Sequence, residues 1–409
     1  MVRAAFRFLA LAGLFATVAA AQESDYGFSV PMTLSAGGMY THRTQSDEPD
    51  ASPVTGGFRA MLYPTLKLGS HWFAYAAVQV RLAPYFYYDA YDPDHEFYNN
   101  VLQAFVGYSF HPGAATMVVK AGRLTSAFGS FPPRYDDLDN PLLDQPLAYN
   151  WQLPLYTNQL PCGVKSFAGY GGGQANCFEY WEDSSQPGVV PVTLYSLPGI
   201  EADFSGYRFD GRVQVTSGSP ASPQSLSRAG QFAQWATGGG YTIRQGFRVG
   251  ISGFRGPYLD ASLASWLPAG TTLRSFPASG VGIDVQFARG RWSATGEWQR
   301  FWFDLPNFAQ SPAVAAGYGE VKAILTPRFY LAERIGWISS RNVASDGYSA
   351  EFMSPTSSYE TAAGCWLNRY QLLKVGYEWL HSEYQPGTLG NVFGVQLVTS
   401  VHGLNWAFR

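Results

Sequence analysis

Charged residues are scarce in this chain. Asp, Glu, Lys and Arg make up only 14% of its 409 residues, against about 25% in ordinary soluble proteins. The balance is also nearly even, with 27 basic and 30 acidic residues and a formal net charge of -3. Nothing here provides the basic surface that nucleic acid requires, so we expect no nucleic-acid partner.

Long apolar runs are missing as well. Mean hydropathy is -0.11 although 46% of the residues are hydrophobic, so polar and apolar residues must alternate finely instead of forming membrane-spanning stretches of about 20 residues. The 44 glycines and 26 prolines disfavour long helices, because inside a helix Gly costs about 1 kcal/mol and Pro about 3 kcal/mol. The composition therefore excludes an all-helical protein.

Cysteine is rare, with three residues in the chain. Cys162 and Cys177 bracket a glycine-rich polar segment, which in an oxidising compartment predicts a disulfide that closes a short loop. Two buried free thiols are the alternative, and Cys365 is left without a predicted partner. No spacing of cysteine and histidine suits zinc, so we expect no metal and no other cofactor.

Residues 1–21 predict a secretory signal peptide. Two arginines precede an apolar run over residues 8–18, and three alanines at 19–21 offer a cleavage site. A transmembrane anchor is the competing interpretation, but the run is shorter than the roughly 20 residues that cross a bilayer. We expect residues 22–409 to form one secreted domain.

After residue 22 the dominant pattern has period two. In residues 208–216 the apolar set Phe209, Gly211, Val213 and Val215 alternates with the polar set Arg208, Asp210, Arg212, Gln214 and Thr216. A soluble sandwich does not easily bury the polar set, whereas a membrane barrel offers lipid to one face and water to the other. The pattern predicts an all-β fold, a closed antiparallel transmembrane β-barrel of about 16 strands, between 14 and 18.

The segments between these strands differ in length at the two ends. Tight connections are expected near residues 69–71, 205–206, 289–291 and 369–371, and long polar connections at 42–53, 84–96, 257–274 and 342–354. Outer-membrane barrels have short periplasmic turns and long extracellular loops. We therefore place the tight connections in the periplasm and the long ones outside.

The end of the chain carries a resemblance. Leu404, Trp406 and Phe408 alternate up to a near-terminal aromatic residue, and this looks like the C-terminal signature of bacterial outer-membrane proteins, which the barrel-assembly machinery recognises in that family. The sequence departs from the pattern at Arg409, because the aromatic residue usually comes last. The resemblance implies a bacterial outer-membrane location, with lipid and that machinery as partners.

A connection at about residues 126–198 is much longer than an ordinary hairpin loop. The stretch A-G-R-L-x-x-x-F-G at 121–129, with N-P-L-L-D-x-P-L at 140–147, resembles the region after the strand that precedes the long infolded loop of the phosphate-selective porin O/P and related channels. The resemblance implies a pore that this loop narrows. The candidate constriction residues are Arg134, Asp136, Asp137, Asp139 and Asp144.

The loop departs from that group in its charge. Phosphate-selective members have a basic constriction, whereas this loop is acidic, so phosphate selectivity is not carried over. The alternative is an external cap in which the aspartates are solvated turn formers. An inward loop would instead set its carboxylates against wall arginines and create a transverse field that favours polar solutes.

Strand register alone predicts the residues of the lumen wall. Both signs of charge are present, so the wall groups either shape a pore or neutralise each other. The predicted wall residues are Arg59, Arg81, Lys120, Arg208, Arg212, Arg248, Glu297, Lys322, Arg334, Lys374 and Glu378. About 16 strands leave an aqueous channel, whereas about eight fill with side chains.

These features predict a passive outer-membrane porin for small hydrophilic solutes or ions. No nucleotide, hydrolase or zinc-protease motif occurs, so we expect no enzyme. The alternatives are a transporter of hydrophobic compounds and a barrel scaffold, either an adhesin or a sleeve for a partner such as an electron carrier. A homotrimer is common among similar porins, and the sequence leaves it open.

Overall fold

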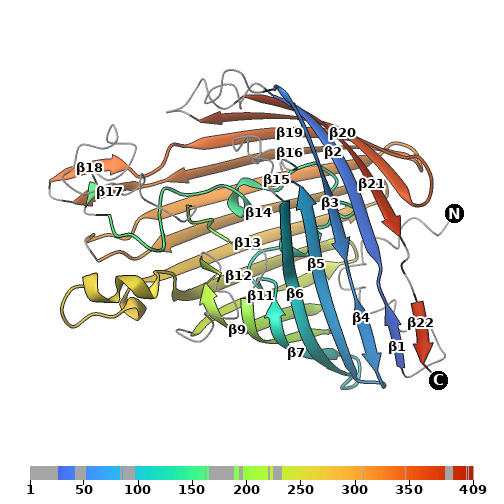
Figure 1. Cartoon of the computed structure of the whole chain (residues 1–409), viewed down its shortest axis with the longest axis horizontal. Coiled ribbons are helices and arrows are strands. Elements are labelled where there is room, and N and C mark those ends of the chain that lie inside the picture. Colours follow the sequence, from blue (N-terminus) through green and yellow to red (C-terminus); the bar gives the residue numbers. More distant parts are fainter. Residues whose placement is uncertain are drawn as a thin grey trace.

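A computed structural model shows one closed antiparallel barrel (Figure 1). It describes residues 26–41, 52–82, 85, 97–161, 163–164, 188–192, 197–219, 222–223, 233–306, 308–345, 347–382, 390–401, 403 and 405–408. The predicted signal peptide lies outside these residues. In the described part of the chain, no helix is long and apolar enough to span a membrane.

The wall consists of 16 strands, three of which are interrupted and carry two labels. In chain order they are β1 (Tyr26–Ser29) with β2 (Met32–Thr41), β3 (Val54–Leu62) with β4 (Thr65–Leu68), β5 (Trp72–Leu82), β6 (Phe97–Phe110), β7 (Thr116–Leu124), β8 (Leu197–Gly206), β9 (Phe209–Ser219), β11 (Ala233–Arg244), β12 (Phe247–Pro257), β13 (Pro277–Arg289), β14 (Trp292–Phe303), β15 (Ala313–Ile324), β16 (Phe329–Ser340), β19 (Thr356–Trp366), β20 (Gln371–Ser382), and β21 (Asn391–Val401) with β22 (Asn405–Phe408). The predicted fold is confirmed.

The first and last strands close the barrel. β1 pairs with β22 and β2 pairs with β21, with Gly37 opposite Gln396. Closure removes the sheet edges, so no row of backbone N–H and C=O groups is left unpaired in a medium without water. This requirement explains why the wall segments adopt strands although they contain many glycines.

The predicted alternation is present in the wall. On β9, Val213 and Val215 are 60% and 53% exposed, whereas Gln214 and Thr216 are 0% and 2% exposed. The apolar set therefore faces outward, toward lipid, and the polar set faces the lumen. β16 repeats the pattern, because outward-facing Ile335 is 62% exposed while lumen-facing Arg334 is 2% exposed.

Short turns gather at one end of the barrel and long connections at the other, which we call the turn end and the loop end. β1 and β22 lie at the turn end, and the hairpin β17 (Asn342–Ser345) with β18 (Tyr348–Glu351) projects at the loop end (Figure 1). The 3-10 helices η9 (Ala261–Trp266) and η10 (Leu273–Ser275) lie in another long connection, and β10 (Ser222–Pro223) pairs antiparallel with the end of β9.

One predicted wall residue is misplaced. The sequence predicts a turn at 205–206 with Arg208 on the wall, but β8 continues to Gly206 and the turn is Tyr207–Arg208. Both turn residues have positive φ, 53° and 70°, as in a type I′ hairpin. Such turns usually contain Asn and Gly, so this sequence gives no turn signal, and exposed Arg208 bonds the carbonyl of Ile243 at 3.4 Å.

This turn predicts a stabilising variant. Non-glycine residues in the left-handed region cost roughly 1–2 kcal/mol each, so Tyr207→Asn combined with Arg208→Gly should raise the free energy of unfolding by about 1 kcal/mol or more. Urea unfolding in phospholipid vesicles measures the change. Gly290→Ala is the control, because Gly290 also has positive φ with no atom near its Cβ position, and it should lower stability. An unchanged midpoint in the first variant contradicts the interpretation.

Candidate functional site

Residues 125–161, which we call the inward segment, fold into the barrel instead of capping it. The segment contains two 3-10 helices, η4 (Pro132–Arg134) and η5 (Leu147–Tyr149). Its backbone and side chains bond lumen-facing side chains on β3, β5, β9, β14, β15, β16, β19 and β20. In Figure 1 it runs inside the barrel, between the two sides of the wall.

The segment first follows the wall from β9 to β14. The side-chain amide of Gln214 on β9 forms two hydrogen bonds with the backbone of the segment. It accepts from the N–H of Ala127 at 3.1 Å and donates to the carbonyl of Thr125 at 2.7 Å. At Gly238 on β11 a Cβ atom would lie only 2.3 Å from the carbonyl oxygen of Ala127. The absence of a side chain there lets the two backbones approach.

A buried glutamate then fixes the segment to β14. Glu297 accepts hydrogen bonds from the Ser130 backbone N–H at 3.0 Å and from the Tyr149 hydroxyl at 2.9 Å. Gly129 has φ 80° and its Cβ position lies 2.0 Å from that hydroxyl oxygen, so this tight approach also requires glycine. Glu297 thereby joins two parts of the segment that are far apart in sequence.

Asp137 anchors the segment on the opposite side of the lumen. Its carboxylate accepts from Arg59 on β3 at 3.0 Å and from the Tyr85 hydroxyl at 2.9 Å. The Arg59 guanidinium also donates to the Tyr135 carbonyl at 3.1 Å and lies 4.1 Å from that ring centroid. Asp136 bonds the Tyr63 hydroxyl. The segment thus crosses from β14 and β15 to β3.

Lys374 on β20 binds the backbone of residues 137–142, which we call the return turn. Its ammonium group donates to the backbone carbonyls of Asp137, Asn140 and Leu142 at 2.8, 3.0 and 3.0 Å. The side chain is completely buried. Three carbonyl acceptors match the three N–H donors of an ammonium group, so a backbone turn replaces the water that this lysine would otherwise bind.

Arg334 on β16 forms the centre of a buried charge network. It donates to Glu320 at 2.8 Å, to Glu360 at 3.1 Å and to the Asp144 carbonyl at 2.8 Å. Glu320 also pairs with Arg134 of the segment at 2.5 Å, and Glu360 accepts from the Asp144 backbone N–H at 3.0 Å. Wall and segment are thereby joined by charge-assisted bonds, the stronger class of hydrogen bond.

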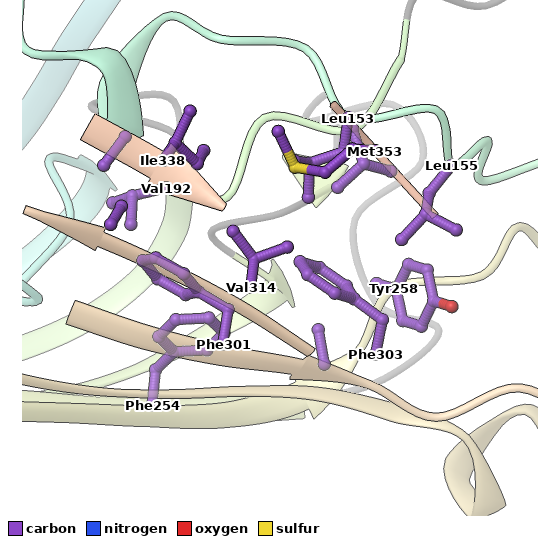
Figure 2. Close-up of a cluster of buried hydrophobic side chains, with 14 of the residues drawn as sticks. Leu153, Leu155, Val192, Phe254, Tyr258, Phe301, Phe303, Val314, Ile338 and Met353 are labelled. Atoms are coloured by element: carbon purple, nitrogen blue, oxygen red, sulfur yellow. The ribbon is translucent and has the colours of Figure 1, made fainter. Parts of the chain in front are cut away.

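The loop end of the lumen is filled by apolar side chains. Leu153, Leu155 and Val192 pack against wall residues such as Phe301 and Val314, and all five are at most 1% exposed. Figure 2 shows Phe254, Tyr258, Phe303, Ile338 and Met353 in the same cluster. This cluster attaches the segment to β12–β16 and excludes water from that side of the lumen.

Other charged wall groups pair with one another. Lys120 on β7 bonds Glu201 at 2.8 Å and Asp203 at 2.5 Å, both on β8. Arg248 on β12 bonds Asp210 at 2.5 Å and Asp284 at 2.7 Å. The mutual neutralisation that the sequence left open therefore occurs at these two sites.

The remaining predicted wall residues make weaker or different contacts. Arg212 reaches the Gly129 carbonyl at 3.5 Å. Arg81 lies 4.9 Å from the Tyr98 ring centroid and Lys322 lies 4.2 Å from the Tyr330 ring centroid. Glu378 is buried opposite Glu360 in the strand register.

The electrostatic arrangement differs from the simple field of loop acids against wall arginines. Asp137 with Arg59 follows that arrangement, but Arg134 reverses it by pairing with a wall carboxylate. The Asp144 carboxylate accepts from the Gln145 N–H and the Asn150 amide, and Arg334 binds only its backbone carbonyl. Both signs occur on both surfaces, because each buried charge needs a partner.

Burial is the largest cause of the pKa shifts of three acids in the segment, Asp136, Asp139 and Asp144. It raises the pKa of Asp136, with Asp137 adding to the shift while Tyr63 opposes it. It also raises the pKa of Asp144, together with Glu378 and Glu360. Asp139 opens onto lumen water but sits deep in the barrel, so partial desolvation and then Asp136 raise its pKa to about 7.

Several contributors were not among the predicted site residues. Neutral and acidic side chains that face the lumen form many of the hydrogen bonds that fix the inward segment. They are Gln79, Gln214, Gln299, Tyr318 and Glu360. Each lies on a wall strand at a lumen-facing position. The period-two register therefore contained the signal, although the predicted wall residues were mainly basic.

Two groups of predicted residues stay predictions, the disulfide cysteines and the C-terminal signature. Cys162 and Cys177 lie outside the described residues, as does Leu404. Trp406 and Phe408 lie on β22, where they pair in register with Phe28 and Tyr26. In the part of the chain that the structure describes, no cluster of His, Cys, Asp or Glu could hold a metal ion.

The Arg334 network predicts a large loss of stability. Arg334→Met leaves the buried Glu320 and Glu360 carboxylates short of a partner, which should cost about 3–5 kcal/mol. Arg334→Met with Glu360→Gln should recover part of that loss, because one buried charge is removed. Urea unfolding in vesicles measures both, with the exposed Arg328→Met as control, expected within about 0.5 kcal/mol of wild type. Equal stability of Arg334→Met and the control refutes the role of this network.

Comparison with known proteins identifies the fold. No protein-family model and no curated protein match the sequence. Among solved structures, Salmonella typhi OmpF in complex with daunomycin matches with a TM-score of 0.55 and 8% identity over 91% of this chain and 97% of that chain. The outer membrane channel DcaP of Acinetobacter baumannii matches with a TM-score of 0.54 and 10% identity over 92% of this chain and 97% of that chain. An anion-selective porin from Comamonas acidovorans matches with a TM-score of 0.52 and 11% identity over 93% of this chain and 100% of that chain. The chain therefore has a porin-like barrel fold, while its resemblance to the phosphate-selective porin O/P group stays a prediction.

Proposed function

We propose that this protein is a bacterial outer-membrane porin through which small hydrophilic solutes diffuse passively. The inward segment carries the proposal, because it crosses the lumen of a 16-strand barrel and is fastened to the wall on both sides. A barrel of this size encloses an aqueous lumen. A segment fixed across that lumen sets the cross-section without any energy input.

The passage is proposed to lie beside β6–β8. The apolar cluster occupies the lumen next to β12–β16, and the return turn occupies the side next to β20. On β7 and β8 the lumen-facing groups are instead charged, with Lys120 between Glu201 and Asp203. Paired charges of both signs suit polar solutes and avoid a strong preference for either ion sign.

The fold likeness supports this function without identifying the solute. OmpF, DcaP and the Comamonas protein share the architecture at 8–11% identity, and a shared fold alone does not carry a shared function. The buried, multiply bonded segment favours a channel over an adhesin or a sleeve, because those roles need neither a crossing segment nor charged groups inside the wall.

Planar-bilayer recording tests the channel. We expect the refolded protein to give stable ohmic conductance, and Lys120→Glu to raise the cation-to-anion permeability ratio roughly twofold or more, because three carboxylates would then line one side of the passage. Glu333→Gln, on the outward face of β16, is the matched control and should leave the ratio unchanged. A closed bilayer would reject the proposed function, and an unchanged ratio in Lys120→Glu would move the passage away from β7.

Asp139 predicts a pH dependence. With a pKa of about 7, its carboxyl is neutral at pH 6 and negative at pH 8, so cation preference should rise between these values. Asp139→Asn should abolish the rise, while Asp260→Asn in the long connection after β12 should not. Reversal potentials in a KCl gradient at both pH values measure the effect. A rise that persists in Asp139→Asn assigns it to another group.

A further inference from the structure

Two arginines lie on the lipid-facing surface near the loop end of the barrel. Arg255 on β12 is exposed and Arg300 on β14 is half-buried. Side chains alternate between faces along a strand, and both arginines share the face of Ile251 and Trp298, which are 71% and 40% exposed. Their charges therefore point away from the lumen and cannot serve the channel.

The strand register brings the two arginines together. Arg255 lies opposite Ser279 on β13, and Arg300 lies opposite the next outward residue on that strand, Val281. Strands are about 4.8 Å apart and successive same-face residues about 6.8 Å, which separates the two α-carbons by roughly 12 Å. Ser279 and Val281 are short, so both long side chains can converge above them.

Neither guanidinium has a carboxylate partner among the described residues. Arg300 packs against the Trp302 ring, 5.2 Å from its centroid. The acidic residue that follows β14, Asp304, accepts from the Ser311 hydroxyl instead. A pair of cations at the lipid surface with no acidic partner in the part of the chain that the structure describes favours an anion supplied by the membrane.

Flanking tryptophans place the pair at headgroup level. Trp235 lies opposite Arg255 on β11, and Trp302 lies opposite Ser279 on β14. Aromatic girdles mark both interfaces of membrane barrels. The outward residues closer to the membrane centre, Ile251 and Ile283, are apolar, so acyl chains fit directly below the arginines.

We propose that Arg255 and Arg300 bind a phosphate monoester on the headgroup of a glycolipid in the leaflet at the loop end. A monoester carries a charge between about -1.5 and -2 at pH 7, which matches two guanidinium groups, whereas the diester of a glycerophospholipid carries one. Arginine presents its N–H donors in a planar fork suited to phosphate oxygens. The Ser279 hydroxyl between them provides a further donor.

Native mass spectrometry of the detergent-solubilised, folded protein tests this site. The probes are diphosphorylated lipid A, the same lipid A after removal of both phosphates, and phosphatidylglycerol. We expect wild type to bind the diphosphorylated form about tenfold more tightly than the other two, equivalent to about 1.4 kcal/mol. The double variant Arg255→Gln with Arg300→Gln should bind all three alike.

Two further variants make the result decisive. Arg291→Gln with Arg328→Gln removes two exposed arginines at the turn end and should keep the wild-type preference. Arg255→Gln alone changes one exposed side chain, so it should fold even if the double variant does not, and it should reduce the preference several-fold. Equal binding of phosphorylated and dephosphorylated lipid A by wild type would overturn the proposal. A preference that survives in both Arg255 variants, or phosphatidylglycerol binding as tight as lipid A, would overturn it as well.

Discussion

The structure depends on one constraint, which is that backbone polar groups surrounded by lipid must bond to each other. A closed antiparallel sheet meets it, and the pairing of β1 and β2 with β22 and β21 completes the ring. Closure then separates the side chains into two sets with period two. The outward set can be apolar throughout, whereas the inward set encloses a space that must be filled by water, by side chains or by another part of the chain.

The inward segment meets this second requirement, and its two sides do so differently. Against β12–β16 it presents Leu153, Leu155 and Phe128 to an apolar wall, so water is excluded there. Against β3, β16 and β20 its backbone carbonyls and aspartates meet Arg59, Arg334 and Lys374. A buried cation is costly without acceptors, so these three side chains fix the path of the segment as firmly as the apolar cluster does.

The outer surface follows the same rule with the membrane as partner. Most outward positions are apolar, so a charged side chain on the outer surface points to a partner in the membrane. Arg255 and Arg300 have no acid nearby among the described residues and sit between tryptophans, so their partner is sought in the lipid. Inside the barrel the equivalent cations find theirs in the chain itself, as Lys120 does with Glu201 and Asp203.

The sequence by itself determined the barrel, a strand number between 14 and 18, the two kinds of connection and the alternation of outward and inward side chains, because period-two alternation is a local property that each segment displays alone. It failed locally at Tyr207–Arg208, where a positive-φ turn formed from residues that do not signal one. The path of the inward segment was decided only by the tertiary structure. Arg134 pairs with Glu320, Lys374 donates to three backbone carbonyls, and Gly238 lets the backbone of Ala127 approach. These contacts depend on which groups from distant strands lie within bonding distance, and no local sequence pattern encodes that.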